Sequence, residues 1–270
     1  MKKVKNSILW LILILVSAGF VSCKRTPRAK SDDIVINGKF TNADGRMLWL
    51  KELNGNSVHV IDSVLLGKEG DFSFRIEAQN TGLYQVSIRK NDFAVIIATR
   101  GETIMLNGDA DHLSSTWDAK GSKETLLYLD YWNVSRKQLK QADSVTFIFR
   151  NSHMSPDYMT TRIRLDSIFN TIMDKQREGA TLFVKANPGS LASLLVIDAK
   201  FSSIPLFNEE RDVSYYKLLD SCLSKTYKDN ALVANFHTRF QHINKRIKLH
   251  QGTNRILPPG ELNPSFSPNR

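Results

Sequence analysis

The spacing of apolar residues changes at Gly121–Ser122, and this change divides the chain into two kinds of structure. Before it, apolar and polar residues alternate strictly from Phe72 to Glu77, which is the pattern of a strand with one buried face. After it, apolar residues recur at helical spacing. The clearest helical set is Leu165, Ile168, Phe169, Ile172 and Met173. The sequence therefore predicts an α+β fold, with strands first and helices second.

The first part, residues 33–115, reads as about seven short strands separated by turns at intervals of roughly 8 to 12 residues. Turn-forming residues lie at Asn42–Gly45, Asn54–Asn56 and Arg100–Gly101. Short strands with such regular turns are typical of two antiparallel sheets packed face to face. We therefore predict an antiparallel β-sandwich for this part.

The second part, residues 120–250, is predicted to be a small array of helices. Ser122 is placed to cap a helix that follows it. The segment Val145–Phe149 is apolar and fits a helix or a strand equally well. Asn187–Pro188 combines a capping residue with a proline suited to a first helical turn, so it predicts that a helix opens there and includes 191–199.

The first 22 residues have the regions of an export signal. Three lysines and no acid precede an apolar run at Ile8–Val16, which is followed by small residues. This run is shorter than the roughly 20 apolar residues that a membrane span needs. Phe20–Cys23 resembles a lipobox, so we predict that Cys23 becomes the first residue and carries lipid, followed by a flexible linker over 23–32. The alternatives are an ordinary cleaved secretory signal and a short membrane anchor.

Cysteine content and charge restrict the function further. The only cysteines are Cys23 and Cys222, so lipidation of the first leaves no intramolecular disulfide. The formal charge is +10, and removing the three signal lysines leaves 10 minus 3, or +7. In an exported protein this charge indicates affinity for anionic lipid or acidic glycans more than for nucleic acid, or simply a lysine-rich surface. The acid-free segment Asn230–Gly260 could face a membrane, an acidic partner or solvent.

A set of residues in fixed order carries a family resemblance. Asp62–Ser63 followed by Gly70, Phe72 and Phe74 resembles the core of a domain of unknown function found at the N-terminus of many Bacteroidetes thiol:disulfide interchange lipoproteins. Further landmarks that resemble this family are Asn37–Gly38, Leu106–Asp109, Gly121–Ser122, Asn187–Pro188 and Ser190. The resemblance covers roughly Asp33 to Leu257.

The proline-rich segment 251–270 extends the resemblance. Gly260–Phe266 is similar to the entry to the thioredoxin-like domain of those lipoproteins, with Asn263 where alanine is usual. The sequence given ends at Arg270, before the redox Cys-x-x-Cys, so no catalytic residue can be carried over. The segment directly after Cys23 lacks the acidic cluster that sends some Bacteroidetes lipoproteins to the cell surface, so we predict a lipid-anchored protein of the cell envelope, at the outer membrane and facing the periplasm.

Candidate chemical groups have simpler structural explanations. Cys222 lies in an apolar helical stripe, where core packing is expected rather than a reactive thiolate. His237, His242 and His250 do not share one helical face, so surface histidines are expected rather than a metal site. No nucleotide, hydrolase or metalloprotease motif occurs. The sequence thus predicts no cofactor and gives no positive support for an enzyme.

Three functions remain as hypotheses. The first is a non-catalytic protein-interaction module, for which a periplasmic thioredoxin-like protein is a possible partner. The second is a truncated thiol:disulfide oxidoreductase that has lost its catalytic half. The third is a glycan-binding module, which exposure of at least two candidate aromatic residues on one face would favour and burial of all four would exclude. These residues are Trp49, Tyr84, Trp117 and Trp132.

Overall fold

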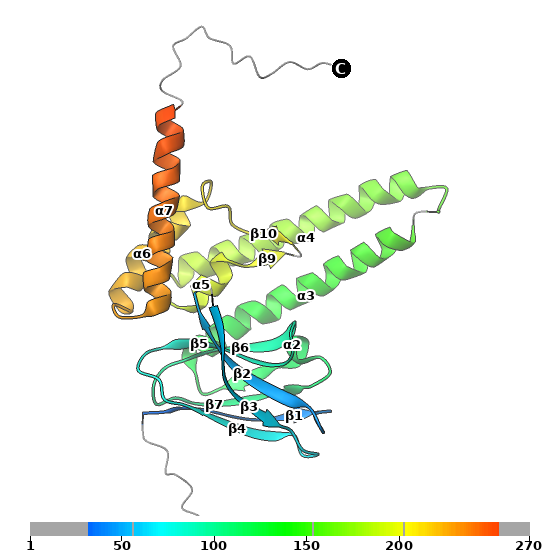
Figure 1. Cartoon of the computed structure of the whole chain (residues 1–270). Coiled ribbons are helices and arrows are strands. Elements are labelled where there is room, and N and C mark those ends of the chain that lie inside the picture. The colour runs from blue at the N-terminus through cyan, green and yellow to red at the C-terminus, as the bar shows by residue number, and fades with distance from the viewer. Residues whose placement is uncertain (1–31, 56, 153, 202, 254–270) are drawn as a thin grey trace, which may run out of the picture. The chain divides into compact units, whose positions relative to one another are not determined.

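The computed structural model describes residues 32–55, 57–152, 154–201 and 203–253 (Figure 1). The predicted export signal, the lipidation site at Cys23 and almost all of the proline-rich tail lie outside these residues. Within them, the chain folds into two four-stranded sheets followed by helices, which confirms the predicted α+β class.

The two sheets contain eight strands. The first sheet has the order β4 (Asp71–Ile76), β1 (Ile34–Thr41), β7 (Thr103–Asp109) and β8 (Asp118–Lys120). The second has the order β3 (Ser57–Leu65), β2 (Met47–Asn54), β5 (Gly82–Arg89) and β6 (Asp92–Ala98). One pair departs from the predicted antiparallel arrangement, because β1 and β7 run parallel. Apolar alternation has a period of two in either direction, so it cannot reveal strand direction.

Alternating side chains from both sheets form the core between them. On β2, Leu48 and Leu50 are buried and Trp49 is exposed, as a strand with one inward face requires. On β4, the rings of Phe72 and Phe74 are both buried, with their centroids 5.7 Å apart. The burial of these regularly spaced apolar residues fixes the register of each strand.

The helices follow the sheets in sequence, apart from one short helix between β7 and β8. They are α2 (Leu113–Thr116), α3 (Lys123–Asn151), α4 (Tyr158–Ala186), α5 (Ala192–Ile197), α6 (Val213–Thr226) and α7 (Ala231–Thr253). A two-stranded ribbon, β9 (Lys200–Phe201) and β10 (Ile204–Pro205), lies between α5 and α6. The ambiguous segment Val145–Phe149 is helical, within α3. In the described part of the chain, every helix is too short or too polar to cross a bilayer.

Ser122 caps α3 as predicted and also ties this helix to the second sheet. Its Oγ accepts a hydrogen bond from the Thr125 backbone N–H at 3.4 Å and donates one to the Ile97 carbonyl at 2.7 Å. Thr125 Oγ1 donates to the same carbonyl at 2.7 Å. These buried bonds set the start of α3 against β6, so the helices begin from a fixed point on the sheet.

A helix does form within the predicted 191–199, but the prediction that Asn187–Pro188 opens it is wrong. Asn187 instead ends α4, where its side-chain Nδ2 donates to the Phe183 carbonyl at 3.0 Å. The next helix, α5, begins only at Ala192, whose backbone N–H donates to Ser190 Oγ. The asparagine side chain can hydrogen-bond the unpaired backbone groups at either end of a helix. An asparagine in the sequence therefore does not show whether a helix begins or ends there.

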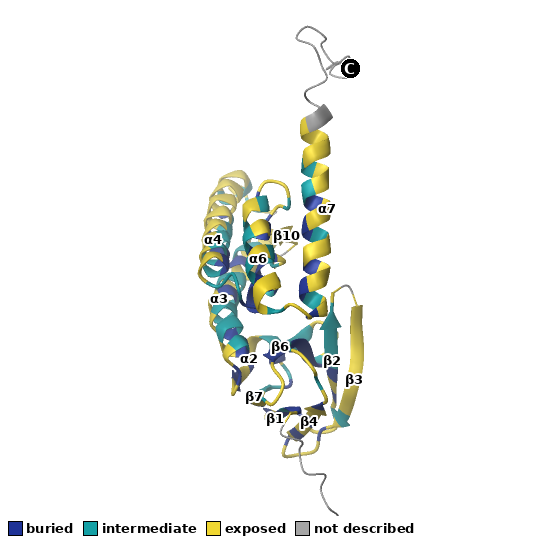
Figure 2. Ribbon diagram, turned by 90° about the vertical axis from the view of Figure 1, so that its left-hand side faces the viewer, coloured by how far each residue is buried: buried dark blue, intermediate teal, exposed yellow. Residues whose placement is uncertain are grey.

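A second core lies among the helices and includes part of the second sheet. Leu83 and Ile97, which come from β5 and β6, pack with buried residues of α4 to α7. Figure 2 shows the buried residues of these helices on their inward sides. The described residues from Asp32 onward therefore form one compact unit.

Asp212, just before α6, is held by hydrogen bonds within this second core. Burial raises the pKa of Asp212. Hydrogen bonds from the Asn208 backbone N–H and the Arg177 guanidinium lower it by more than burial raises it, so the net pKa lies below the ordinary 3.8. Both donors are 2.7 Å from the carboxylate oxygens, and the Asp212 side chain is 7% exposed. A carboxylate with a lowered pKa stabilises the folded state above its ordinary pKa.

We therefore expect Asp212→Asn to reduce the free energy of unfolding by about 2 kcal/mol at neutral pH. The difference from the unsubstituted chain should shrink as the pH falls through the lowered pKa of Asp212. Urea unfolding at neutral and acid pH measures both quantities. Asp71→Asn, in the exposed pair with Lys39, is the control and should cost well under about 1 kcal/mol. An equal loss from Asp212→Asn at both pH values would contradict this account.

Candidate interaction surface

The outer face of the second sheet, turned away from the first sheet, is covered over only half its width. Under the helices, its residues on β5 and β6 are buried: Leu83, Gln85, Ser87, Val95 and Ile97. Over β2 and β3 the same face is open, and Figure 2 shows β3 as an exposed strand beside the partly buried β2. The helices therefore leave the β2–β3 half without cover.

Pairing between β2 and β3 places an apolar set on this open half. Met47 lies opposite Leu65, and Lys51 lies opposite Val60. Residues that pair directly across strands point to the same side, and Met47 and Trp49 point outward because Leu48 between them is buried. We call the resulting set the apolar strip. It consists of Met47, Trp49, Val58, Val60 and Leu65, whose exposed fractions run from 37% to 63%.

The two open edges of the sandwich differ in their chemistry. On β4 the exposed residues are Asp71, Ser73 and Arg75, which are the polar side chains that usually protect an edge strand from other chains. On β3, the exposed residues include Val58 and Val60. A bulge beside Lys51 and the polar residues of β3 limit uncontrolled pairing, but they leave the apolar strip open. Exposed apolar side chains gathered at one place are typical of surfaces that bind proteins, membranes or ligands.

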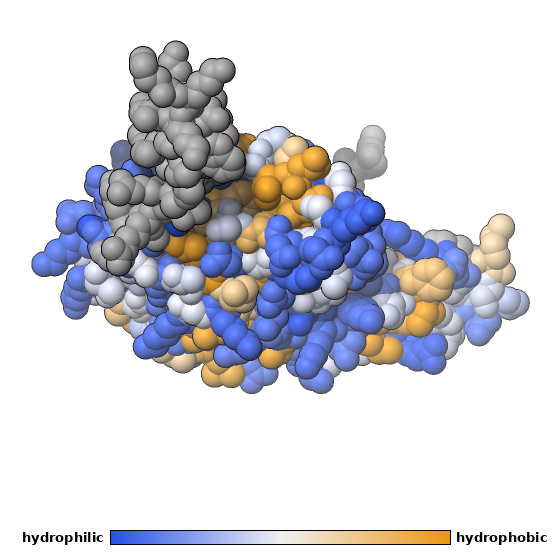
Figure 3. Space-filling view, turned by 90° about the horizontal axis from the view of Figure 1, so that it is seen from below, coloured by the Kyte–Doolittle hydropathy of each residue, from blue (hydrophilic) through white to orange (hydrophobic). Residues whose placement is uncertain are grey.

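The apolar strip continues into a groove between the β2–β3 hairpin, α5 and α7. The groove has a volume of about 990 Å³. Its apolar lining is Leu53, Val58, Leu83, Leu194, Leu195, Leu232 and Phe236. Val58 belongs to both the strip and the groove, so the two form one continuous surface. Figure 3 shows, on the face seen from below, apolar side chains gathered in patches between hydrophilic ones.

One wall of the groove is polar and comes mainly from α7. Arg239 donates to Asp198 at 2.6 Å and to Glu209 at 2.8 Å, and its guanidinium lies 5.4 Å from the centre of the Tyr216 ring. Arg246 pairs with the same Glu209. Burial raises the pKa of Glu209, but the two arginines lower it to a net value below the ordinary one. The acid-free helix is therefore balanced by acids from other segments, which form ion pairs with it along this wall of the groove.

Other residues considered in the sequence lie apart from one another. Cys222 is half-buried on α6. His237 contacts Asp220 at 2.8 Å, His250 lies 3.7 Å from Glu210, and only His242 lines the groove. Among the described residues, no group of three or more His, Cys, Asp or Glu side chains is arranged to hold a metal ion.

The four aromatic residues proposed for glycan binding do not form one exposed surface. Tyr84 and Trp117 are buried, and burial raises the pKa of Tyr84 to about 12. Trp132 is half-buried and its indole N–H donates to the Ser114 carbonyl at 2.9 Å. Trp49 is exposed, in the apolar strip. One of the four is exposed, so no pair of exposed aromatic residues favours a glycan-binding face, and the four are not all buried either.

The sequence reasoning missed the apolar strip and the acids that hold α7. Val58 and Val60 fit a strand, but the apolar pattern does not say which strand lies at an edge. Glu209 joins two arginines that lie 30 and 37 positions away in the chain, so its neighbours in the sequence do not reveal the pairing. One feature of the sequence could have indicated these ion pairs. The segment from Asn230 has basic residues and no acid, and the consecutive acids Glu209 and Glu210 precede it.

Comparison with known proteins identifies one region of the chain. Residues 34–128 match a family model described as a domain of unknown function, DUF4369. The match includes both sheets and the first residues of α3. No curated protein matches the sequence. Residues 34–128 are therefore a DUF4369 domain.

Proposed function

We propose that this protein is a non-catalytic protein-interaction module anchored by lipid in the bacterial cell envelope, at the outer membrane and facing the periplasm. The observation that carries the proposal is the apolar strip on the open β2–β3 edge, which continues into the groove. In water, such a contiguous apolar surface is unfavourable, and a partner that covers it gains the free energy of its burial.

The geometry of this surface fits a folded partner that presents an exposed apolar strand or loop. The β3 edge offers backbone groups for an added strand, and the apolar strip offers contacts for every second side chain of that strand. The groove beside it accepts a larger side chain or a short segment. Its paired charges at Arg239 and Asp198 form a polar rim around the apolar floor, an arrangement common in protein interfaces.

The resemblance to thiol:disulfide interchange lipoproteins supports a periplasmic protein of thioredoxin fold as the partner. In those proteins a domain resembling this one is joined to a thioredoxin-like domain. We expect a periplasmic protein of that fold to contact the apolar strip. Lipid at Cys23 would keep the module on the membrane while residues 24–32 act as a spacer.

A charge in the middle of the apolar strip is expected to break this contact. Val60→Asp should reduce capture of a thioredoxin-fold protein by about tenfold or more, because a partner that covers the apolar strip would then have to remove a carboxylate from water, which is costly even beside Lys51. Val60 is more than half exposed, so the substitution should leave the fold unchanged. The measurement is a pull-down from envelopes prepared under reducing and under oxidising conditions.

Ser73→Asp is the matched control, since it adds the same charge to the other open edge. It should capture the partner as well as the unsubstituted chain does. Failure to enrich any thioredoxin-fold protein under either condition would count against this partner. Equal capture by Val60→Asp would show that the apolar strip is not the docking surface.

A further inference from the structure

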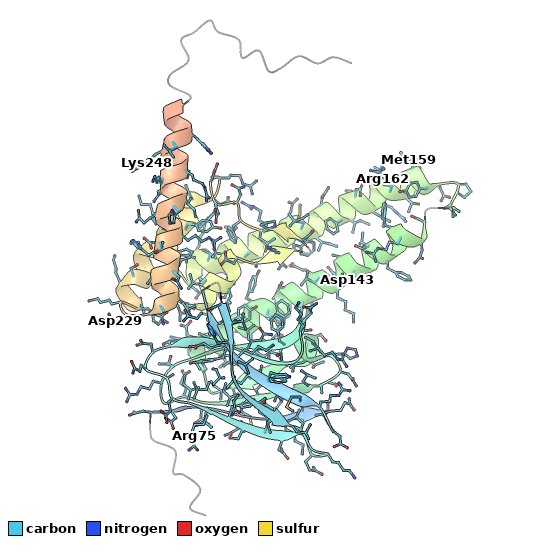
Figure 4. All side chains as sticks on the ribbon, in the orientation of Figure 1. Arg75, Asp143, Met159, Arg162, Asp229 and Lys248 are labelled. Atoms are coloured by element: carbon cyan, nitrogen blue, oxygen red, sulfur yellow. The ribbon has the colours of Figure 1, made fainter. Side chains whose placement is uncertain are left out.

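The far end of the α3–α4 helix pair contacts nothing else in the described part of the chain. No described residue between positions 143 and 164 is buried, and the nearest buried residues are Ala142 and Leu165. Figure 1 shows the loop between the two helices at the end remote from the sheets, and Figure 4 places Met159 and Arg162 near that end. We call the described residues 147–152 and 154–164 the hairpin tip.

The hairpin tip exposes large apolar side chains on each of its three segments, which are the end of α3, the loop and the start of α4. They are Phe147 (69% exposed), Ile148 (48%), Met154 (97%), Met159 (61%) and Ile163 (67%). Immersion of the tip in an apolar layer would cover the exposed residues of all three segments together.

Cationic side chains lie next to these apolar residues. The hairpin tip contains Arg150, Arg162 and Arg164, against the single acid Asp157. Arg162 makes only an exposed pair with Asp166, at 3.7 Å, and Arg150 and Arg164 have no ion-pair partner among the described residues. The next acids, Asp143 and Asp166, lie outside the tip, and Figure 4 shows Asp143 farther back along α3.

We propose that the hairpin tip inserts into the interface of an anionic lipid bilayer. Its apolar residues would enter the boundary between headgroups and acyl chains, and the three arginines would contact anionic headgroups. The contact goes beyond the proposed function, because it uses neither the lipid on Cys23 nor the apolar strip. It would give the membrane-anchored module a second attachment point and hence a defined orientation.

Quenching of a tryptophan by brominated lipid tests the insertion directly. The full lipid-anchored chain with Met154→Trp is mixed with excess vesicles of phosphatidylglycerol and phosphatidylcholine, with and without bromine on the acyl chains. We expect the new tryptophan to lose about half its emission in brominated vesicles, because interfacial groups lie roughly 5–10 Å into the headgroup and acyl boundary. The unsubstituted chain gives the background of the native tryptophans.

Two further variants give the specificity of the contact. Val58→Trp, in the apolar strip, should show no added quenching. Arg150→Ser with Arg164→Ser should reduce the quenching of Met154→Trp, as should vesicles of phosphatidylcholine alone. If Met154→Trp is quenched no more than Val58→Trp, the proposal is wrong. A blue shift that needs no vesicles and grows with protein concentration would assign the tip to a second copy and also overturn it.

Vesicle flotation of the same samples separates this proposal from the lipid anchor. A chain that floats with vesicles but shows no tip quenching retains the anchor and loses the tip contact. A chain whose tip is quenched in excess vesicles but which washes off in salt retains the tip contact without the anchor.

Discussion

Replacing Gly70 by alanine is expected to lower the free energy of unfolding by about 3 kcal/mol. Gly70 has a φ of +70°, and a Cβ there would lie 1.9 Å from the Phe40 carbonyl oxygen. That oxygen belongs to the backbone of β1, which cannot move without disturbing its pairing with β4 and β7. The Phe40 N–H also donates to the Gly70 carbonyl at 3.0 Å, so the turn and β1 are held together.

Gly45 provides a matched control for this substitution. It has the same φ of +70°, but a Cβ there would meet no atom within 4 Å. Gly45→Ala should therefore cost only the backbone strain, about 1 kcal/mol. Urea unfolding followed by tryptophan fluorescence measures both variants, because Trp117 is buried in the sandwich core. Similar losses from the two substitutions would mean that the contact between Gly70 and Phe40 does not constrain the sheet.

Replacing Cys23 by serine is expected to move nearly all of the protein from the membrane fraction to the soluble fraction. Each buried acyl methylene contributes about 0.8 kcal/mol, so several chains give an attachment that survives washing. Serine has no thiol to carry the lipid. The proposed contact of the hairpin tip is reversible and screened by salt, so it would not retain the protein through a salt wash.

Cys222→Ser is the matched control, since it removes the other cysteine and should leave the protein on the membrane. Fractionation of cells followed by detection of the protein gives both results. Retention of the Cys23→Ser chain in the membrane fraction would favour a membrane anchor without lipid. An unsubstituted chain that is already soluble would favour an ordinary cleaved secretory signal.

Much of the fold could be predicted because burial leaves a periodic trace in the sequence. Phe72 and Phe74 are two residues apart on one strand and both face the core. Ser122 is a typical capping residue, and it caps the start of α3. β8 was missed because three residues are too few to show a period. The parallel pairing of β1 with β7 was missed because strand order depends on contacts between residues far apart in the chain.

The candidate surface was less predictable than the fold. The identity of Val60 as an apolar strand residue is visible in the sequence, but its exposure follows from β3 being an edge strand that the helices do not cover. In the same way, Arg239 is visible as a basic residue, but its pairing with Asp198 depends on how α7 packs beside α5. The apolar strip is exposed because no helix packs over it, and the sequence around its residues cannot show that absence.

Site-specific photo-crosslinking from Val60 in living cells tests the proposed docking surface most directly. A photoreactive residue at this position contacts whatever covers the apolar strip, while the same residue at Ser73 samples the polar edge strand of the first sheet. The proposed function predicts a discrete adduct with a second protein from Val60 and none from Ser73. Absence of an adduct at Val60, or identical adducts from both positions, would contradict it.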